Sequence, residues 1–475
     1  MATLISSVCW IPRGFPAEFP KKQSLTEEEI RQISNATKEQ ISHAREEMTE
    51  DGFDAPRDLN DDLEEYNLEA YDDEEDIEQT GFLSGSKIAY FENPEDPYIV
   101  LDEKEEDKER AELQILPTDN ILLSSKTEDD ISNLEIYVYE DSAENLYVHH
   151  DILLPSMPLC LEWLYPEDGL NLVAVGTFEP GIEVWDVDTI DGYYPHTILG
   201  GSTKKKKKKA NESYHVSAVL SLSANRNHRN LLASGSADQT VKLWDLRDSK
   251  CASSTSYHED KVSAVQWHAS DSTVLLSGGY DRQIIISDMR ASAPSMKVSA
   301  DGDIESISWD PHSPYHFFAS TESGSVFYFD MRVKKDAQWK LEAHSGPVSS
   351  MSINPHIPGY LATGSVDKQT KLWNVKDSPS LVVSRDLGVG KVFTISWAPD
   401  AEVSWRLAVG GSEGSLQIWD TRTNAAVRDA FKIQDDEVQK ERLVGLAEPV
   451  DSSSDEGEDD EGSDEEIDGQ ESMKE

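Results

Sequence analysis

Cysteine is scarce in this chain, and so are long apolar runs. The three cysteines among 475 residues, Cys9, Cys160 and Cys251, lie far apart and without metal-ligand spacing. An odd, dispersed set argues against a disulfide framework and is typical of a reducing compartment. No stretch approaches 18 consecutive apolar residues, and the N-terminus carries no basic leader followed by an apolar core. We therefore expect neither a membrane span nor a secretory signal.

Positive charge is the second deficit. The chain holds 43 Lys and Arg residues against 92 Asp and Glu residues, a formal net charge of −49. Residues 51–78 and 451–475 alone supply −25 of that charge, and they are too polar to bury a core of their own. A negative field repels phosphates, so the composition favours basic partners over general nucleic-acid binding. Solubility alone is the competing interpretation of these tracts.

Motifs for catalysis and nucleotide binding are missing as well. The sequence contains no G-x-x-x-x-G-K-[ST] loop, no G-x-G-x-x-G, no H-E-x-x-H and no C-x-x-C. We therefore predict a chain that is not an enzyme, with no cofactor, no metal and no small-molecule substrate.

What the sequence does contain is a repeat with a period in the low forties. Residues 231–245 return as residues 360–374 and 407–420, and weaker copies occur between them and upstream. The positions aligned with the repeat tryptophan are 185, 244, 287, 329, 373 and 419. An alternating stretch such as residues 262–267 precedes five of the copies, as expected for a half-buried strand. This period and pattern indicate WD repeats, with four strands in each blade.

The N-terminus fits the same strand template. Residues 5–12 match it, but the continuation is found only at residues 120–125 and 134–140, so an insertion splits this repeat. Tyr139 stands 46 residues before Trp185, one period away. A closed ring leaves only short protected sheet edges. We predict an all-β fold, a seven-bladed WD-repeat β-propeller, with residues 425–431 as the outer strand of its last blade.

Four segments follow from this prediction. Residues 1–12 are the first strand of blade 1, residues 13–115 an acidic insertion, residues 116–433 the propeller, and residues 434–475 a disordered acidic tail. A capping box at residues 26–29 and a narrow apolar stripe predict a helix near 26–48. That helix could pack on the propeller or on a partner.

Three blades repeat a set of polar residues that resembles a catalytic triad. The sets are His215, Asp238 and Trp244; His258, Asp281 and Ser287; and His344, Asp367 and Trp373, with Ser234 and Ser365 nearby. An active site is normally built once, so recurrence favours a scaffold role. In that interpretation the aspartate of a tight turn accepts from the histidine and the backbone, which ties strand to turn.

Candidate contact sites lie outside the repeats. Within the acidic insertion, Leu59, Leu63, Tyr66 and Ala70 recur at helical spacing, with Leu68 and Tyr71 beside them. We predict a partner-binding motif whose candidate contact residues are Leu59, Leu63, Tyr66, Leu68 and Tyr71. Disorder with chance spacing is the alternative.

A basic loop between two blades consists of Lys204, Lys205, Lys206, Lys207, Lys208 and Lys209. It suits nuclear import or contact with RNA phosphates, against a merely solvated loop. In the tail, candidate phosphorylation sites for an acidophilic kinase of casein kinase II type are Ser452, Ser453, Ser454 and Ser463.

Outside the repeats, several motifs resemble the periodic tryptophan protein 1 family of nucleolar WD-repeat proteins, in its fungal form. They are residues 10–15 (WIPRGF), 61–68 (DDLEEYNL), 71–75 (YDDEE), 117–120 (PTDN) and 147–151 (YVHHD), together with the lysine run. The resemblance implies a phosphoprotein scaffold of ribosome biogenesis in the nucleus and nucleolus. It would act on the large (60S) subunit precursor and on maturation of its ribosomal RNA.

The resemblance also implies partners: pre-60S assembly factors and ribosomal proteins, with pre-ribosomal RNA and histones as further candidates and no membrane. An alternative function is a histone-binding chromatin regulator at ribosomal DNA that uses the acidic tracts as a chaperone. An adaptor subunit for an enzyme such as a ubiquitin ligase is a third.

Overall fold

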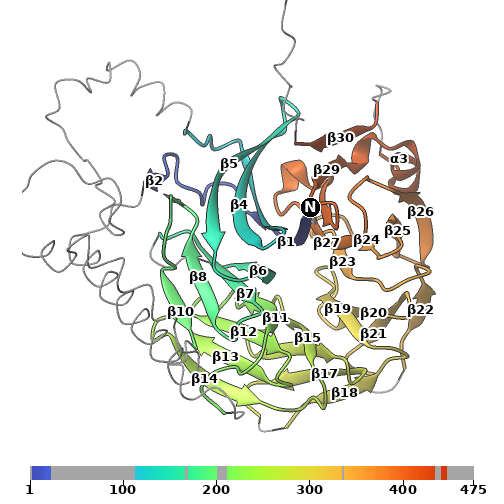
Figure 1. The fold of residues 1–475 in the computed structure, drawn as a ribbon. Coiled ribbons are helices and arrows are strands. Elements are labelled where there is room, and N and C mark those ends of the chain that lie inside the picture. Colours follow the sequence, from blue (N-terminus) through green and yellow to red (C-terminus); the bar gives the residue numbers. More distant parts are fainter. Residues whose placement is uncertain are drawn as a thin grey trace, which may run out of the picture.

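Seven four-stranded antiparallel sheets follow one another around a ring (Figure 1). The computed structural model describes residues 3–22, 113–165, 169–200, 211–291, 293–333, 336–433 and 440–446, and the statements below concern these residues. The sheets confirm the prediction of an all-β, seven-bladed propeller.

The first four blades are formed by strands between Thr3 and Ser299. Blade 1 contains β1 (Thr3–Ile11), β3 (Asn120–Glu128), β4 (Ile131–Glu140) and β5 (Asn145–Leu154). Blade 2 contains β6 (Pro158–Trp163), β7 (Leu172–Thr177), β8 (Ile182–Asp186) and β10 (Thr197–Leu199). Blade 3 contains β11 (Val219–Ala224), β12 (Leu231–Ser236), β13 (Val241–Asp245) and β14 (Lys250–Thr255). Blade 4 contains β15 (Val262–Trp267), β16 (Val274–Gly279), β17 (Gln283–Asp288) and β18 (Met296–Ser299).

The remaining three blades complete the ring. Blade 5 contains β19 (Ile304–Trp309), β20 (His316–Thr321), β21 (Ser325–Asp330) and β22 (Trp339–Glu342). Blade 6 contains β23 (Ser350–Ile353), β24 (Tyr360–Gly364), β25 (Thr370–Asn374) and β26 (Ser380–Arg385). Blade 7 contains β27 (Val392–Trp397), β28 (Arg406–Gly411), β29 (Leu416–Asp420) and β30 (Arg442–Gly445). Short 3-10 turns, η3 (Ala401–Val403) and η4 (Thr421–Thr423), flank β28 and β29.

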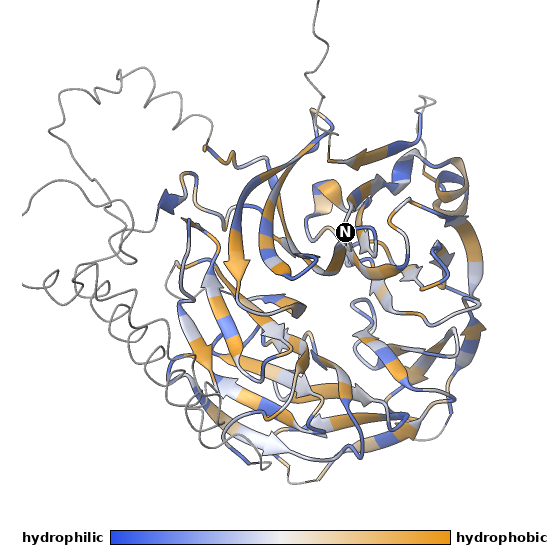
Figure 2. Ribbon diagram, viewed as in Figure 1, coloured by the Kyte–Doolittle hydropathy of each residue, from blue (hydrophilic) through white to orange (hydrophobic). Residues whose placement is uncertain are grey.

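Burial differs between the four strands of a blade, which explains their sequence patterns. The inner strand β15 alternates between buried and half-buried residues, whereas β16 and β17 are buried along nearly their whole length. The outer strand β14 is largely exposed and polar. Figure 2 shows the hydrophobic residues concentrated within the sheets. The core therefore lies between neighbouring blades, where the faces of adjacent sheets meet.

The N-terminal strand belongs to a blade whose other strands come a hundred residues later. β1 pairs with β3 in a register that runs from Thr3 opposite Glu128 to Ile11 opposite Ile121. On its other side β1 lies against blade 7, where Val8 N–H donates to Thr394 Oγ1 over 3.2 Å. β1 is thus both the inner strand of blade 1 and the piece that closes the ring.

Blade 7 corrects one prediction. Residues 425–431 form helix α3 (Ala425–Phe431) rather than the outer strand, which is β30. The reason is local: the Asn424 side chain accepts from the N–H groups of Ala426 and Val427 and caps the helix. Val427 and Phe431, one turn apart, then face the core. The propeller consequently continues past the predicted boundary at residue 433, and β30 lies within the segment that we had predicted to be a disordered tail.

Both ends of the insertion are fixed near blades 1 and 2. β2 (Lys21–Lys22) pairs in parallel with β9 (Thr189–Ile190), a short strand between β8 and β10. At the other end, Ile115 N–H donates to Glu18 O over 2.9 Å. Among the described residues, no helix has the length and apolar content needed to cross a membrane.

Candidate functional site

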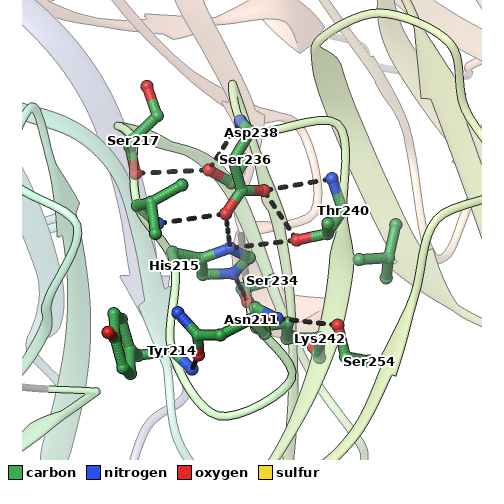
Figure 3. Close-up of polar contacts among 12 residues, drawn as sticks. Asn211, Tyr214, His215, Ser217, Ser234, Ser236, Asp238, Thr240, Lys242 and Ser254 are labelled. Atoms are coloured by element: carbon green, nitrogen blue, oxygen red, sulfur yellow. Dashed lines mark hydrogen bonds and ion pairs between the residues drawn. The ribbon is translucent and has the colours of Figure 1, made fainter. Parts of the chain in front are cut away.

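The triad-like residues of blade 3 form a buried hydrogen-bonded network (Figure 3). His215 Nδ1 lies 2.9 Å from Asp238 Oδ2, and His215 Nε2 lies 2.6 Å from Ser234 Oγ. The indole N–H of Trp244 donates to the same Ser234 hydroxyl over 2.8 Å. Asp238 also accepts the backbone N–H groups of Val216 and Thr240. The network thereby joins β12, β13, the turn between them and the segment that leads into β11.

The pKa shifts and the burial in this network favour a structural role over a catalytic one. Burial lowers the pKa of His215, so the imidazole is neutral near pH 7. Burial also opposes ionisation of Asp238, but hydrogen bonds from His215, Thr240 and Val216 outweigh it and lower the pKa of that carboxyl. The Ser234 hydroxyl is fully buried and already accepts a hydrogen bond from the indole N–H of Trp244. A substrate atom therefore has no approach to it.

Blades 4 and 6 repeat the arrangement with one correction to the sequence analysis. His258 Nε2 lies 2.9 Å from Ser277 Oγ, and His344 Nε2 lies 2.8 Å from Thr363 Oγ1. Trp373 donates to Thr363 Oγ1 as well, over 2.9 Å. Ser365, which the sequence suggested, instead accepts the backbone N–H of Asp367. A threonine hydroxyl serves as well as a serine here, which a search for serine alone misses.

Sequence reasoning also missed a buried lysine in blade 3. Lys242 is fully buried, and its ammonium group donates to Asn211 O and Ser254 Oγ, each over 2.7 Å (Figure 3). Burial lowers its pKa. In blade 6 the equivalent Lys371 donates to Ala343 O, so the lysine one position before Leu-Trp was the available signal. Lys242 thus holds residue 211, two positions after the lysine run, onto blade 3.

A second missed feature is a set of side chains on the inner strands that accept hydrogen bonds from a neighbouring blade. Ser221 Oγ accepts from Val265 N–H over 3.0 Å, and Ser350 Oγ accepts from Ile395 N–H over 3.1 Å. Between blades 2 and 3 the acceptor is the Glu162 carboxylate, 2.8 Å from Ala224 N. Burial raises the pKa of Glu162 to about 7, although the hydrogen bond from Ala224 N–H and the charge of Arg226 oppose the shift. These bonds join blade 2 to blade 3, blade 3 to blade 4, and blade 6 to blade 7.

Three exposed apolar side chains lie at the start of β4, near the end of β5 and directly after β7. Ile131, Leu153 and Phe178 are 60%, 64% and 58% exposed, and we call them the blade 1 tip patch. Leu153 pairs with Asn133, two residues after Ile131, so both apolar side chains point to one face of the sheet. Phe178 N–H donates to Met157 O in the loop that leaves β5. Grouped exposed apolar side chains are typical of protein-binding surfaces.

The site residues predicted from sequence lie outside the described residues. This holds for the helix near residues 26–48, for Leu59, Leu63, Tyr66, Leu68 and Tyr71, for Lys204 to Lys209, and for Ser452, Ser453, Ser454 and Ser463. Within the described part of the chain, no group of three or more His, Cys, Asp or Glu residues is placed to hold a metal ion.

Known proteins resemble this chain at two levels. The family model described as "WD domain, G-beta repeat" matches residues 207–245, 249–288 and 336–374. A Schizosaccharomyces pombe protein named as an uncharacterized WD repeat-containing protein is 49% identical over 94% of both chains. Periodic tryptophan protein 1 of Saccharomyces cerevisiae is 36% identical over 92% of this chain and 91% of its own. The periodic tryptophan protein 1 homolog of Drosophila melanogaster is 30% identical over 91% and 97%, respectively.

Proposed function

Since this chain belongs to the periodic tryptophan protein 1 family, we propose that it is a non-enzymatic assembly factor of ribosome biogenesis. Its target is the large (60S) subunit precursor and the maturation of the ribosomal RNA in that particle. The observation that carries the proposal is the match to family members over more than nine tenths of this chain. The buried histidine–aspartate networks support a scaffold, because they hold strands together where an enzyme would expose a reactive group.

The ring provides the platform in this proposal. Channel-side hydrogen bonds between blades and the β1 closure make it rigid, so surfaces on different blades keep fixed distances. The blade 1 tip patch offers the apolar contact for a protein partner. Residues 51–78 and 451–475 supply negative charge for basic partners such as ribosomal proteins, with phosphorylation of the tail serines adding more.

The six lysines supply the opposite charge at one place. In this proposal Lys204 to Lys209 contact phosphates of pre-ribosomal RNA and direct the protein to the nucleus and nucleolus. Lys242 supports this role because it holds the chain directly after the loop onto blade 3.

Affinity purification from cells at low salt tests the proposal, with RNA and protein content read from the same eluate. We expect precursor RNA of the large subunit together with large-subunit proteins and assembly factors. A variant with Lys204 to Lys209 changed to Gln tests the RNA contact. It should recover less RNA per unit of protein than the natural chain. Core histones without precursor RNA would contradict the proposal and favour a chromatin regulator at ribosomal DNA.

A further inference from the structure

The strands of blade 1 are longer than those of blade 7, its neighbour across the closure of the ring (Figure 1). β3, β4 and β5 have 9, 10 and 10 residues, whereas β27, β28, β29 and β30 have between 4 and 6. Tyr137 and Tyr139 of β4 belong to one buried cluster with Ile418 of blade 7. The same face of blade 1 continues past Tyr137 to the start of β4 and the end of β5, where Ile131 and Leu153 are 60% and 64% exposed. The shorter strands of blade 7 thus leave this end of the face uncovered.

Ile131 and Leu153 form one apolar surface there. Along β4, every second residue from Ile131 to Tyr139 points to this face. Leu153 pairs with Asn133 and therefore shares the face. Ile131 is the diagonal neighbour of Leu153, two residues before Asn133, and such neighbours lie close enough for long side chains to touch. An exposed apolar pair on an uncovered sheet face is typical of a protein contact.

Two exposed carboxylates of blade 1 flank this pair. Glu128 pairs with Ile131 across the β3–β4 turn, so the two side chains lie on one face. Asp151 pairs with Glu135 and precedes Leu153 by two residues, so its side chain lies on that face too. Within the described part of the chain, neither Glu128 nor Asp151 has a side-chain hydrogen bond or an ion pair. Both carboxylates are therefore available to a cation.

Blade 7 adds a third carboxylate. Thr3 pairs with Glu128, and the Thr3 hydroxyl donates to Glu413 O over 3.1 Å, which brings residue 413 next to this face. The Glu413 side chain is exposed and has no partner among the described residues. Lys126, the cation that β3 places on this face, lies 3.3 Å from Glu135 Oε1 and is already paired. The field around the apolar pair is therefore negative.

We propose that the blade 1 open face, which consists of Ile131, Leu153, Glu128, Asp151 and Glu413, binds a basic segment of a partner protein. The apolar side chains of that segment cover Ile131 and Leu153, and its lysines or arginines reach the carboxylates around them. The apolar contact excludes water from the centre, and the ion pairs at the rim set the orientation. The inference rests on the proposed function and deepens it, since it gives the chemistry of the partner that contacts the blade 1 tip patch.

Other occupants fail on charge or on apolar content. The three carboxylates repel RNA, and they repel the acidic residues 51–78 and 451–475 of the same chain. A symmetric contact between two copies brings carboxylates of one copy against those of the other. The lysine run has the right charge, but residues 200–211 contain no leucine, isoleucine, valine or aromatic residue. A segment with both apolar and basic side chains matches both properties of the face.

Binding of labelled synthetic peptides to the purified full-length protein tests the proposal by fluorescence anisotropy. The probe is a peptide in which leucine and lysine alternate. Two reference peptides replace its lysines with glutamate or its leucines with serine. We expect the leucine–lysine peptide to bind at least about tenfold more tightly than either reference, because each reference lacks one of the two properties.

Removal of the apolar pair gives the first readout on the protein. Ile131→Ser with Leu153→Ser should weaken binding of the leucine–lysine peptide about tenfold and leave the serine–lysine peptide unaffected. Val333→Ser with Leu381→Ser is the matched control, because these side chains of blades 5 and 6 are 52% and 51% exposed. The control should leave the affinity for both peptides unchanged. Thermal unfolding shows whether each variant is folded.

Charge reversal gives the second readout. Glu128→Lys, Asp151→Lys and Glu413→Lys together should weaken binding of the leucine–lysine peptide about tenfold and reduce its dependence on salt. The matched control makes the same change in net charge in the turns between the third and fourth strands of blades 3, 5 and 6, away from this face. It replaces three exposed carboxylates: Asp248→Lys, Asp336→Lys and Asp377→Lys. The control should have a much smaller effect on the affinity.

Three results would overturn the proposal. They are an affinity that the serine variant does not change, an equal loss of affinity in the two charge-reversed proteins, and binding that appears only after Lys204 to Lys209 are changed to Gln. The first two would leave only general attraction of a basic peptide to an acidic chain. The third would show that the lysines of the same chain occupy the face. Each of these failures leaves the ribosome assignment untouched, because that assignment depends on recovery of precursor particles.

Discussion

The indole N–H of Trp10 donates to the carbonyl oxygen of Ser396 over 3.1 Å, although 386 residues separate them in the chain. Trp10 is in the first strand of the protein and Ser396 in the inner strand of the last blade. Trp309 and Trp397 make the same bond to their preceding blades, to Gln266 O and Ser352 O. The junction between the two ends of the ring is therefore built like the junctions inside it.

Trp10→Ala should open this junction. The indole is buried against blade 7, and loss of a buried tryptophan costs about 3–5 kcal/mol of unfolding free energy. Trp10→Phe keeps most of the apolar area and loses the hydrogen bond, so it should cost less. Urea unfolding followed by circular dichroism measures both variants. Equal stability of the alanine variant and the natural chain would show that β1 does not close the ring.

Ser234→Ala should destabilise blade 3 by about 1–3 kcal/mol, because it leaves a buried imidazole and a buried indole N–H without their shared partner. Ser234→Thr is the matched control, since Thr363 fills this role in blade 6. Thermal unfolding compares the two. If threonine were as damaging as alanine, the hydroxyl would not be what the network requires.

Glu162 gives the stability a dependence on pH. Its folded-state pKa of about 7 exceeds the ordinary value of 4.5, so the folded state holds the proton more tightly than the unfolded chain. The stability that protonation provides is present below about pH 4.5 and is lost as the pH rises through 7. Glu162→Gln keeps an acceptor for Ala224 N–H but cannot ionise. It should therefore unfold at a higher temperature than the natural chain at pH 8, with the difference vanishing near pH 4.5.

Melting curves at closely spaced pH values check this prediction, and only the difference between the two proteins counts, because other buried carboxyls such as Glu305 titrate in the same range. A difference that stays constant from pH 4.5 to pH 8 would show that Glu162 does not titrate as the geometry indicates.

The blade 1 tip patch should matter for binding but not for folding. Ile131→Ser, Leu153→Ser and Phe178→Ser together replace three exposed side chains, so the melting temperature should change little. Recovery of protein partners by affinity purification should fall several-fold. Leu381→Ser, which changes a half-exposed leucine on the outer strand of blade 6, is the control. Undiminished recovery of partners with the triple variant would show that these three side chains are not a contact surface.

The repeat period predicts six blades, because the tryptophan position recurs wherever a four-stranded sheet is required. The seventh follows from residues 5–12, 120–125 and 134–140, which continue the same pattern across the insertion. The last blade was predicted except for its outer strand. Its outer strand, β30, follows a detour through α3, and residues 425–431 read as a strand only if the Asn424 cap and the alanines are ignored. Lys242 was missed because a single lysine in a strand looks solvated, and only the Lys-Leu-Trp sequence that blades 3 and 6 share sets it apart. The candidate contact segments lie outside the repeats. Their sequence therefore predicts the kind of contact they make but not where they lie on the propeller.

Ribosomal RNA synthesis in cells depleted of this protein tests the central claim most directly. Pulse labelling of RNA after depletion compares the mature RNA of the two subunits over the same interval. We expect mature large-subunit RNA to fall several-fold while its precursor accumulates and small-subunit RNA continues to appear, with recovery when the natural chain is restored. An unchanged ratio of large-subunit to small-subunit RNA after depletion would contradict the assignment to the large-subunit precursor.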